Sequence, residues 1–322
     1  MNRFRFPWGD ERRYNANANR IKEKYGGRIQ KVSVNAGFTC PNRDGSKGIG
    51  GCVYCNNQSF TPSYCVDVED ISGQIDKGIR FLEKRYKSSK FFTAYFQSFS
   101  NTYKPLKELK LIYSIALKHK RISGLVVSTR PDCIDDKVLN YLAELSRDYY
   151  VSIEFGIESC YDNTLQWINR GHTFDDTERA INMTAEKGLE VTGHLLFGLP
   201  GESREDMLNQ ADILSYLPLN ALKLHHLQIM KNTKLAALYQ ETPEMFSLFS
   251  MEEYIDFIIE FLEKLNPDIA IERLVSEAPP SHRLNPGWDN KRAEWVQKKI
   301  ESVMEEKDTW QGKQFKKSQK FL

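Results

Sequence analysis

Stretches typical of β-strands alternate with stretches typical of α-helices along much of this 322-residue chain. In residues 71–86, for example, Ile71, Ile75, Ile79 and Leu82 recur at helical spacing. The expected strands cover residues 31–35, 91–96, 124–129, 150–157, 190–199 and 221–229, and the expected helices cover residues 71–86, 106–119, 135–145, 175–188 and 204–214. Six strand-then-helix repeats predict parallel strands joined by right-handed crossovers. We therefore expect an α/β fold, and we favour a partial or complete barrel over an open doubly wound sheet.

The chain divides into three expected parts. Residues 1–30 form a basic N-terminal arm, residues 31–240 form the barrel, and residues 241–322 form a C-terminal extension with a basic tail. Two helices and one strand are expected in the extension, over residues 252–265, 290–306 and 268–274. No long apolar run of about 18 residues is present, so no membrane span is expected. The N-terminus lacks the apolar core of a signal peptide, which predicts a cytoplasmic protein.

Three cysteines lie together in the segment "CPNRDGSKGIGGCVYC", which runs from Cys40 to Cys55. The segment follows the first expected strand, and in barrels of this kind the chemistry lies at the C-terminal ends of the strands. It is also rich in glycine, which lets a backbone wrap closely around a compact ligand. Both features indicate a site for an inorganic group.

The spacing of the three thiols leaves more than one interpretation open. A [4Fe–4S] cluster takes four ligands, so three cysteines would leave one iron free for a small molecule. A structural zinc ion also takes four ligands, and Cys65 or a distant histidine could supply the fourth. Cys65, Cys133 and Cys160 lack cluster spacing, and free cysteines are commonly small buried hydrophobic residues. The sequence does not fix their roles.

Further segments narrow the interpretation. The cysteine segment resembles the cluster loop of radical S-adenosylmethionine enzymes, with a longer gap between the first two cysteines than in the commonest pattern. Four segments resemble, in order, parts of the catalytic subunit of Elongator, and more loosely oxygen-independent coproporphyrinogen oxidase: "STRPD" (128–132), "IEFGIESCYDNTLQWINRGHT" (153–173), "HLLFGLPGE" (194–202) and "LQIMKNTKL" (227–235). "ERLVSEAPPSHRLNPGWDNK" (272–291) resembles the signature of the YhcC/YtqA-like branch. The resemblance covers about residues 15 to 300, and no counterpart of Elongator's acetyltransferase domain is expected.

The resemblance implies a fold and a chemistry. The fold is the partial (β/α)6 barrel of radical S-adenosylmethionine enzymes, followed by a short C-terminal α/β extension. Cys40, Cys52 and Cys55 would bind a [4Fe–4S] cluster, and S-adenosylmethionine would bind at the open iron. A one-electron donor such as flavodoxin or ferredoxin would reduce the cluster. Cleavage of the cosubstrate then yields a 5′-deoxyadenosyl radical.

Five further residues stand at places where the family binds the cosubstrate, although Gln97 and Ser98 depart from the family's motif. Glu158 stands where relatives hold the ribose hydroxyls, and Arg170 stands where they pair with the methionine carboxylate, a partner that suits a guanidinium fork. Gln97 and Ser98 replace a Gly-Gly-Glu-like motif that holds the amino group. Arg130 matches the Elongator-like pattern.

Three histidines are the most plausible ones to face the mouth of the barrel. They are His194, His225 and His226, and strand alternation places the last two on opposite faces.

Charge distribution suggests a polyanionic partner. The net charge is only +2, but residues 1–47 carry eleven Lys and Arg against four Asp and Glu. Phe4, Phe6, Trp8 and Tyr14 are interleaved with these arginines, and such a mixture is used on single-stranded RNA. The favoured hypothesis is a radical enzyme that modifies tRNA at a wobble uridine or its C5 side chain. The alternatives are a radical enzyme for a small metabolite or porphyrin-like substrate, and a non-catalytic zinc protein that binds nucleic acid.

Overall fold

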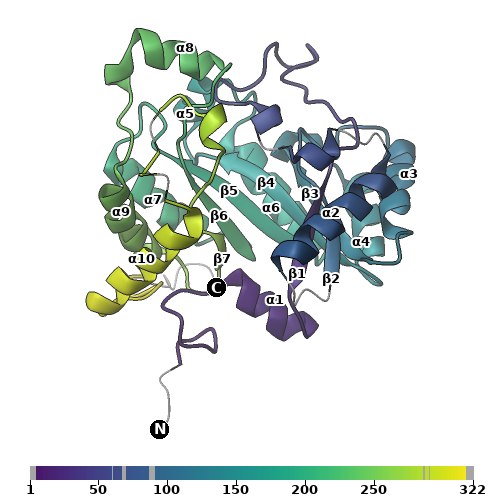
Figure 1. The fold of residues 1–322 in the computed structure, drawn as a ribbon, viewed down its shortest axis with the longest axis horizontal. Helices are drawn as coiled ribbons and strands as arrows, with labels where there is room; N and C mark the ends of the chain where they lie inside the picture. The colour runs from purple at the N-terminus through teal and green to yellow at the C-terminus, as the bar shows by residue number, and fades with distance from the viewer. Residues whose placement is uncertain are drawn as a thin grey trace.

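Seven parallel strands in sequence order form one sheet in the computed structural model, which describes residues 5–59, 61–66, 70–86, 91–285, 287–289 and 291–316 (Figure 1). The strands are β1 (Ile29–Val34), β2 (Phe91–Phe96), β3 (Ile122–Thr129), β4 (Tyr150–Glu158), β5 (Glu190–Phe197), β6 (Ala221–His226) and β7 (Ala270–Arg273). The predicted α/β partial barrel is confirmed. The strand expected in the C-terminal extension is β7, and it pairs in parallel with β6. The extension therefore continues the barrel sheet.

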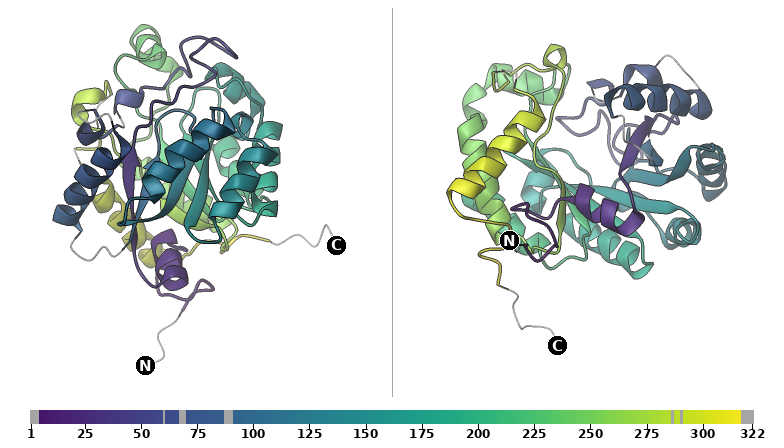
Figure 2. Two further views of the ribbon diagram at one scale, coloured as in Figure 1. Left: turned by 90° about the vertical axis from the view of Figure 1, so that its right-hand side faces the viewer. Right: turned by 60° about the horizontal axis from the view of Figure 1, so that its bottom comes forward.

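Most helices surround the outer face of the curled sheet, while α1 (Asn17–Tyr25) lies at the end where the strands start and α8 (Lys234–Glu241) lies beyond the opposite end (Figure 1 and Figure 2). The other helices are α2 (Ile71–Arg85), α3 (Leu106–Leu117), α4 (Asp136–Leu145), α5 (Asp162–Trp167), α6 (Phe174–Glu186), α7 (Arg204–Leu214), α9 (Met251–Lys264) and α10 (Ala293–Glu306). The sequence predicted all of these except the short α1, α5 and α8. In the part of the chain described, no helix is long and apolar enough to cross a membrane.

The two faces of the strands differ in polarity. The outward face packs against the helices through fully buried residues such as Phe92, Phe96 and Phe155. The inward face carries polar groups instead, among them Lys31 on β1, Glu154 on β4 and Lys223 on β6, which join in ion pairs. Parallel strands covered on both faces usually consist of apolar residues. The interior of this barrel is therefore unusually polar, and its charged side chains form ion pairs.

The N-terminal segment closes the barrel where the strands begin. Ala16 forms a parallel bridge with Ile271 of β7, and the Ile271 N–H donates to the Asn15 carbonyl at 2.6 Å. Lys31 on β1 forms an ion pair with Glu272 on β7, across the gap between the two edge strands. The segment before α1 therefore covers a strand edge that would otherwise present unpaired backbone groups.

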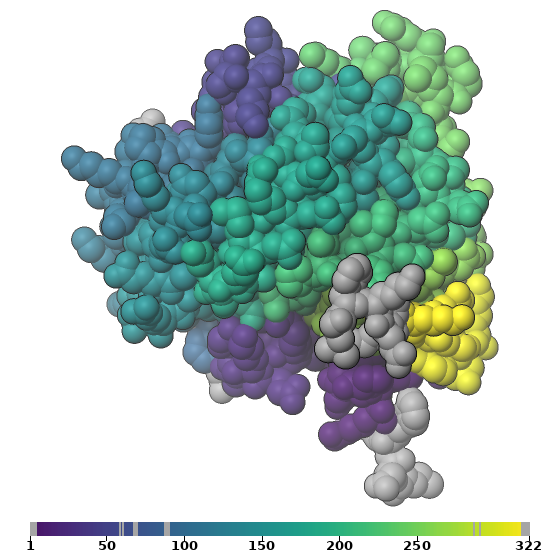
Figure 3. Space-filling view, turned by 180° about the vertical axis from the view of Figure 1, so that it is seen from behind, coloured from purple at the N-terminus to yellow at the C-terminus, as the bar shows by residue number. Residues whose placement is uncertain are grey.

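The arginines of the N-terminal arm form ion pairs with carboxylates of the same chain. Arg13 lies 2.7 Å from Asp308, and Arg20 lies 2.7 Å from Glu190. Arg12 pairs with the Glu301 carboxylate at 3.5 Å. Figure 3 shows the purple N-terminal residues beside the yellow C-terminal ones at the bottom of the molecule.

The aromatic residues of the arm are also engaged. Phe6 stacks on Trp8 at 5.1 Å between ring centroids, and the Trp8 indole donates to the Arg12 carbonyl at 2.9 Å. The arm leads into the N-terminal end of β1, at the end of the barrel where the strands start (Figure 1). Phe4 and the tail lysines Lys317 and Lys320 lie outside the described residues.

Candidate active site in the mouth of the barrel

A cavity of about 260 Å³ opens at the C-terminal ends of the strands. Every residue that the sequence predicted for the cluster or the cosubstrate lines it: Cys40, Cys52, Cys55, Gln97, Ser98, Arg130, Glu158 and Arg170. These residues come from the loop after β1 and from segments that follow β2, β3 and β4. The fold therefore gathers them in one place, as chemistry at strand ends requires.

The loop that carries the three cysteines is tied to distant parts of the chain. The Val53 N–H donates to the Ile168 carbonyl at 3.0 Å, and the Leu235 N–H donates to the Val53 carbonyl at 2.9 Å. The Asn42 side chain donates to the Arg170 carbonyl at 3.1 Å. Gly51 has φ +79°, and a Cβ there would meet the Arg43 guanidinium. The loop is thus held in place at the cavity wall by hydrogen bonds to the segment after α5 and to the start of α8.

Guanidinium groups surround the thiols. Arg170 Nη1 lies 3.6 Å from Cys52 Sγ, and Arg130 Nη1 lies 4.0 Å from Cys40 Sγ. Burial raises the pKa of the Cys55 thiol, and the neighbouring Cys52 raises it further. A buried thiolate needs positive charge or a metal to become stable. The arginines supply part of that charge, so the site suits a group held by thiolates.

The three thiols fit a cluster better than a single ion. No set of three His, Cys, Asp or Glu side chains among the described residues converges closely enough to hold one metal ion. In a cubane cluster each cysteine binds a different iron atom, so its thiols need only face a common space. Cys40, Cys52 and Cys55 all border the same cavity as free thiols. This donor set would leave one iron corner without a cysteine.

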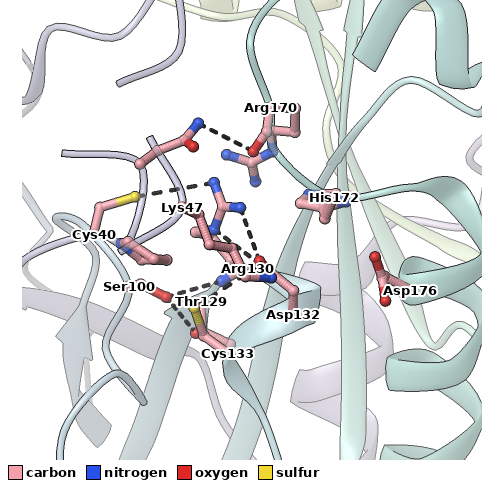
Figure 4. Close-up of polar contacts among 12 residues, drawn as sticks. Cys40, Lys47, Ser100, Thr129, Arg130, Asp132, Cys133, Arg170, His172 and Asp176 are labelled. Carbon is pink, nitrogen blue, oxygen red and sulfur yellow. Dashed lines mark hydrogen bonds and ion pairs between the residues drawn. The ribbon is translucent and has the colours of Figure 1, made fainter. Parts of the chain in front are cut away.

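Arg130 is fixed by a carboxylate behind it. Its Nε and Nη2 donate to the two oxygens of Asp132 at 2.9 and 3.0 Å, and Lys47 contacts the same carboxylate (Figure 4). Burial alone would raise the pKa of Asp132, but the hydrogen bond and charge of Arg130 lower it to about 2. Because Asp132 engages the Nε–Nη2 edge of the guanidinium, Nη1 is the part that reaches Cys40.

Glu158 and Arg170, which are both predicted to bind S-adenosylmethionine, lie side by side. Arg170 Nη2 lies 3.6 Å from Glu158 Oε1 and donates to the Gly156 carbonyl at 2.7 Å. Arg170 Nε is buried and has no hydrogen-bond partner. Glu158 has φ +67°, a backbone conformation that is costly for this residue and that recurs at binding sites. The strained end of β4 therefore turns the carboxylate toward the cavity.

Gln97 and Ser98 border the cavity just beyond the end of β2. Ser98 Oγ lies 3.1 Å from Thr61 Oγ1. These side chains offer neutral polar atoms at the position expected for the group that holds the cosubstrate amine.

The sequence missed a charged network beneath the cavity. Glu154 is fully buried and accepts hydrogen bonds from Tyr95 at 2.7 Å, from Lys223 at 2.7 Å and from Lys31 at 2.7 Å. Burial opposes its charge, but Lys223 and Lys31 hold its pKa well below the usual value. A signal was present, since β1, β4, β6 and β7 each carry a Lys or Glu between apolar neighbours or next to one.

The histidines lie along the wall of β5 and β6. His194 Nε2 lies 2.9 Å from Glu154, and the His225 ring lies 5.5 Å from the His194 ring. His226 stacks instead on Trp288 at 4.0 Å, so it faces the other side of the strand, as alternation predicts. Both His225 and His226 nevertheless border the cavity. Burial lowers the pKa of all three, which keeps these rings neutral.

The remaining cysteines lie outside the cavity lining. Cys65 and Cys160 are buried, and the Cys65 thiol donates to the Ser33 carbonyl at 3.2 Å. Cys133 is half-buried beside Asp132 (Figure 4). Burial raises the pKa of Cys65 and of Cys133 to about 11, so both are thiols at neutral pH.

Comparison with known proteins decides the family. The model of the radical SAM superfamily matches residues 37–213, which hold the cysteine loop and most of the cavity wall. This chain belongs to the radical SAM superfamily. A second model, the Radical_SAM C-terminal domain, matches residues 219–302. The cofactors of this family are a [4Fe–4S] cluster and S-adenosylmethionine. Cys40, Cys52 and Cys55 stay the predicted ligands of the cluster.

Individual relatives refine this placement. YtqA of Bacillus subtilis is 30% identical over 97% of this chain and 96% of its own length, and YhcC of Escherichia coli is 32% identical over 84% and 86%. A tRNA uridine(34) acetyltransferase of Methanocaldococcus infernus is 29% identical over 51% of this chain and 30% of that protein. The solved structure of Methanocaldococcus infernus Elp3 has a TM-score of 0.63 at 18% identity, covering 88% of this chain and 64% of that one, which shows a shared fold.

Proposed function

We propose that this radical SAM enzyme modifies tRNA at a wobble uridine or at the C5 side chain of that uridine. The observation that carries the proposal is the similarity to a tRNA uridine(34) acetyltransferase over 51% of the chain. The sequence segments that resemble the catalytic subunit of Elongator also include the cavity residues Arg130, Glu158 and Arg170. A related reaction in this cavity would therefore act on a related nucleoside, a uridine of tRNA.

Different cavity residues bind the cluster and S-adenosylmethionine. Cys40, Cys52 and Cys55 hold the cluster, and Arg170 binds the carboxylate of S-adenosylmethionine through the buried guanidinium whose Nε has no partner. Glu158 accepts hydrogen bonds from the ribose hydroxyls. A [4Fe–4S] cluster held by these cysteines would pass one electron, supplied by a donor such as flavodoxin or ferredoxin, to S-adenosylmethionine, and this would yield methionine and a 5′-deoxyadenosyl radical able to take hydrogen from the substrate.

The remaining polar groups position and shield the reactants. Gln97 and Ser98 face the cosubstrate amine, and Arg130 balances the negative charge near Cys40. The cysteine loop, held by hydrogen bonds to Ile168 and Leu235, forms part of the cavity wall. A reactive radical survives only where water and other molecules are excluded.

We place the phosphate contacts at the mouth of the cavity. Arg43, Lys231 and Lys234 are exposed on the cysteine loop and on the segment that begins α8. These two segments are adjacent, since the Asn56 side chain donates to the Lys231 carbonyl at 2.9 Å. The arm arginines, which the sequence suggested for this role, are paired with carboxylates at the far end of the barrel.

The test compares the tRNA nucleosides of cells with and without this gene by mass spectrometry. The proposal predicts that one wobble-uridine nucleoside is lost without the gene. A plasmid copy should restore it, and a copy with Cys52→Ala should not. Identical nucleosides in all strains would refute the tRNA function and favour a small-molecule substrate.

A further inference from the structure

One wall of the cavity contains none of the residues assigned to the cluster or to S-adenosylmethionine. It is formed by the ends of β6 and β7 and by the segment after β7, and its polar residues are His225, Gln228, Arg273, Ser276 and Glu277. In a cavity that holds a cosubstrate on one side, such a wall is where the second reactant meets the protein.

Arg273 stands out among the cavity arginines because its guanidinium has no partner. Arg130 pairs with Asp132, and Arg170 lies beside Glu158. Arg273, the last residue of β7, forms no ion pair or hydrogen bond with any described residue. Glu277 borders the same wall, but no ion pair joins it to Arg273. A free planar guanidinium offers two parallel donors to a phosphate or a carboxylate.

His225 offers a second unused group on this wall. Its Nε2 is buried and has no hydrogen-bond partner. Burial, and then the positive charge of Arg273, holds the pKa of His225 well below its usual value, so the ring is neutral and Nε2 can donate or accept a hydrogen bond. Buried polar atoms without a partner are rare in folded proteins and each calls for a reason.

The charges beneath this wall cancel. Lys31 and Lys223 are balanced by Glu154 and Glu272 in the network described above. The charged groups that remain on the β6–β7 wall are therefore Arg273 and Glu277, both exposed. Among them the Arg273 guanidinium is the group that attracts an anion.

We propose that Arg273 and His225 form a subsite for an anionic group, a phosphate or a carboxylate, on the molecule that the radical attacks. The inference rests on the proposed function in one respect, namely that the substrate reacts in this cavity. It does not require that the substrate be RNA. In an RNA substrate the anion is a phosphodiester near the target nucleoside, and in a small substrate it is a carboxylate.

The experiment measures protection of Arg273 from phenylglyoxal, which modifies accessible arginines, in the reconstituted holoenzyme with S-adenosylmethionine. Inorganic phosphate, acetate and chloride are added at equal ionic strength, and peptide mass spectrometry reads the extent of modification. Arg80 is the internal control, because it is exposed on the outer helix α2 and lies away from the cavity lining.

Protection of Arg273 by phosphate or acetate relative to chloride supports the subsite. At an anion concentration about twice its Kd, modification should slow about threefold, because protection follows 1 + [L]/Kd. Stronger protection by phosphate indicates a phosphodiester, and stronger protection by acetate indicates a carboxylate. No protection, or equal protection of Arg80, overturns the proposal.

A variant tests the contribution of the histidine. His225→Asn removes the imidazole, so protection of Arg273 should weaken, while unchanged protection would remove His225 from the subsite. The protection experiment contains no RNA. Its outcome therefore stands apart from the comparison of tRNA nucleosides, and either proposal can fail while the other holds.

Discussion

Both carboxylate oxygens of Glu154 lie 2.7 Å from the Lys223 ammonium group, at the centre of the barrel. The same carboxylate is reached by Lys31 from β1, Tyr95 from β2, Ser128 from β3 and His194 from β5. One side chain thus joins six strands directly below the cavity. The residues of the site lie at the ends of those strands. Because Glu154 joins the strands, it fixes the relative positions of these residues.

Glu154→Gln should be strongly destabilising. Removal of the negative charge leaves Lys31 and Lys223 buried with Glu272 as their remaining carboxylate. Breaking a buried ion pair in this way costs about 3–5 kcal/mol. Urea unfolding measures the loss, with Glu294→Gln as a control because its ion pair with Lys298 is exposed and is worth about 0–1 kcal/mol. Equal, small losses in both variants would contradict the structural role of Glu154.

The cluster should depend on three cysteines and not on the fourth nearby. Cys40→Ala, Cys52→Ala and Cys55→Ala should each lose the iron, the sulfide and the visible absorbance after anaerobic reconstitution. Cys65→Ala should retain all three, because Cys65 is buried against the Ser33 carbonyl and outside the cavity lining. Loss of the cluster in the Cys65 variant would show that a fourth thiol is a ligand.

Arg170 and Glu158 should determine the affinity for S-adenosylmethionine. Arg170→Gln removes the charged partner of the cosubstrate carboxylate, which should cost about 1.5–3 kcal/mol of binding. Glu158→Gln should also weaken binding, because it replaces a charged acceptor of the ribose hydroxyls by a neutral one. Calorimetry on protein with verified iron content measures both affinities. Affinities equal to that of the unaltered protein would refute the assignment.

Arg20 should stabilise the fold rather than bind RNA. Burial opposes the charge of Glu190, but the hydrogen bond and charge of Arg20 lower its pKa. A carboxyl group with a lowered pKa contributes stability above its unfolded pKa of about 4.3 and loses that contribution as the pH falls through the folded value.

Arg20→Gln should therefore lower the free energy of unfolding by about 1 kcal/mol at pH 7. The difference from the unaltered protein should narrow as the solution is acidified below the unfolded pKa of Glu190. Unfolding curves at several pH values measure it, with Arg28→Gln as an exposed control. A deficit that stays constant down to low pH would mean that Glu190 is not the relevant partner.

Local sequence patterns predicted the residues of the cavity better than they predicted the ion pairs around it. Cys40, Glu158 and Arg170 lie in segments with recognisable motifs, and strand periodicity alone places those segments at one end of a barrel. The partners of the arm arginines were not predictable, because Arg13 meets Asp308 and Arg20 meets Glu190, far along the chain. A count of basic residues along the sequence gives no information on carboxylates that lie near them only in the folded chain.

The Glu154 network escaped prediction for a similar reason. The charged residues of the network are spread over β1, β4, β6 and β7, and a Lys or Glu in a strand fits an exposed edge as well as a buried interior. Only the curvature of the sheet brings Lys31 of the first strand to Glu272 of the last. The bridge between Ala16 and Ile271 likewise joins segments that no local pattern connects.

The most direct test measures 5′-deoxyadenosine formed by the anaerobically reconstituted, reduced enzyme, with tRNA purified from cells that lack the gene. The account predicts that this tRNA stimulates release of 5′-deoxyadenosine and that its wobble uridine gains a modification. It also predicts that Cys52→Ala forms neither product. The same slow release with and without tRNA, together with an unchanged wobble uridine, would contradict it.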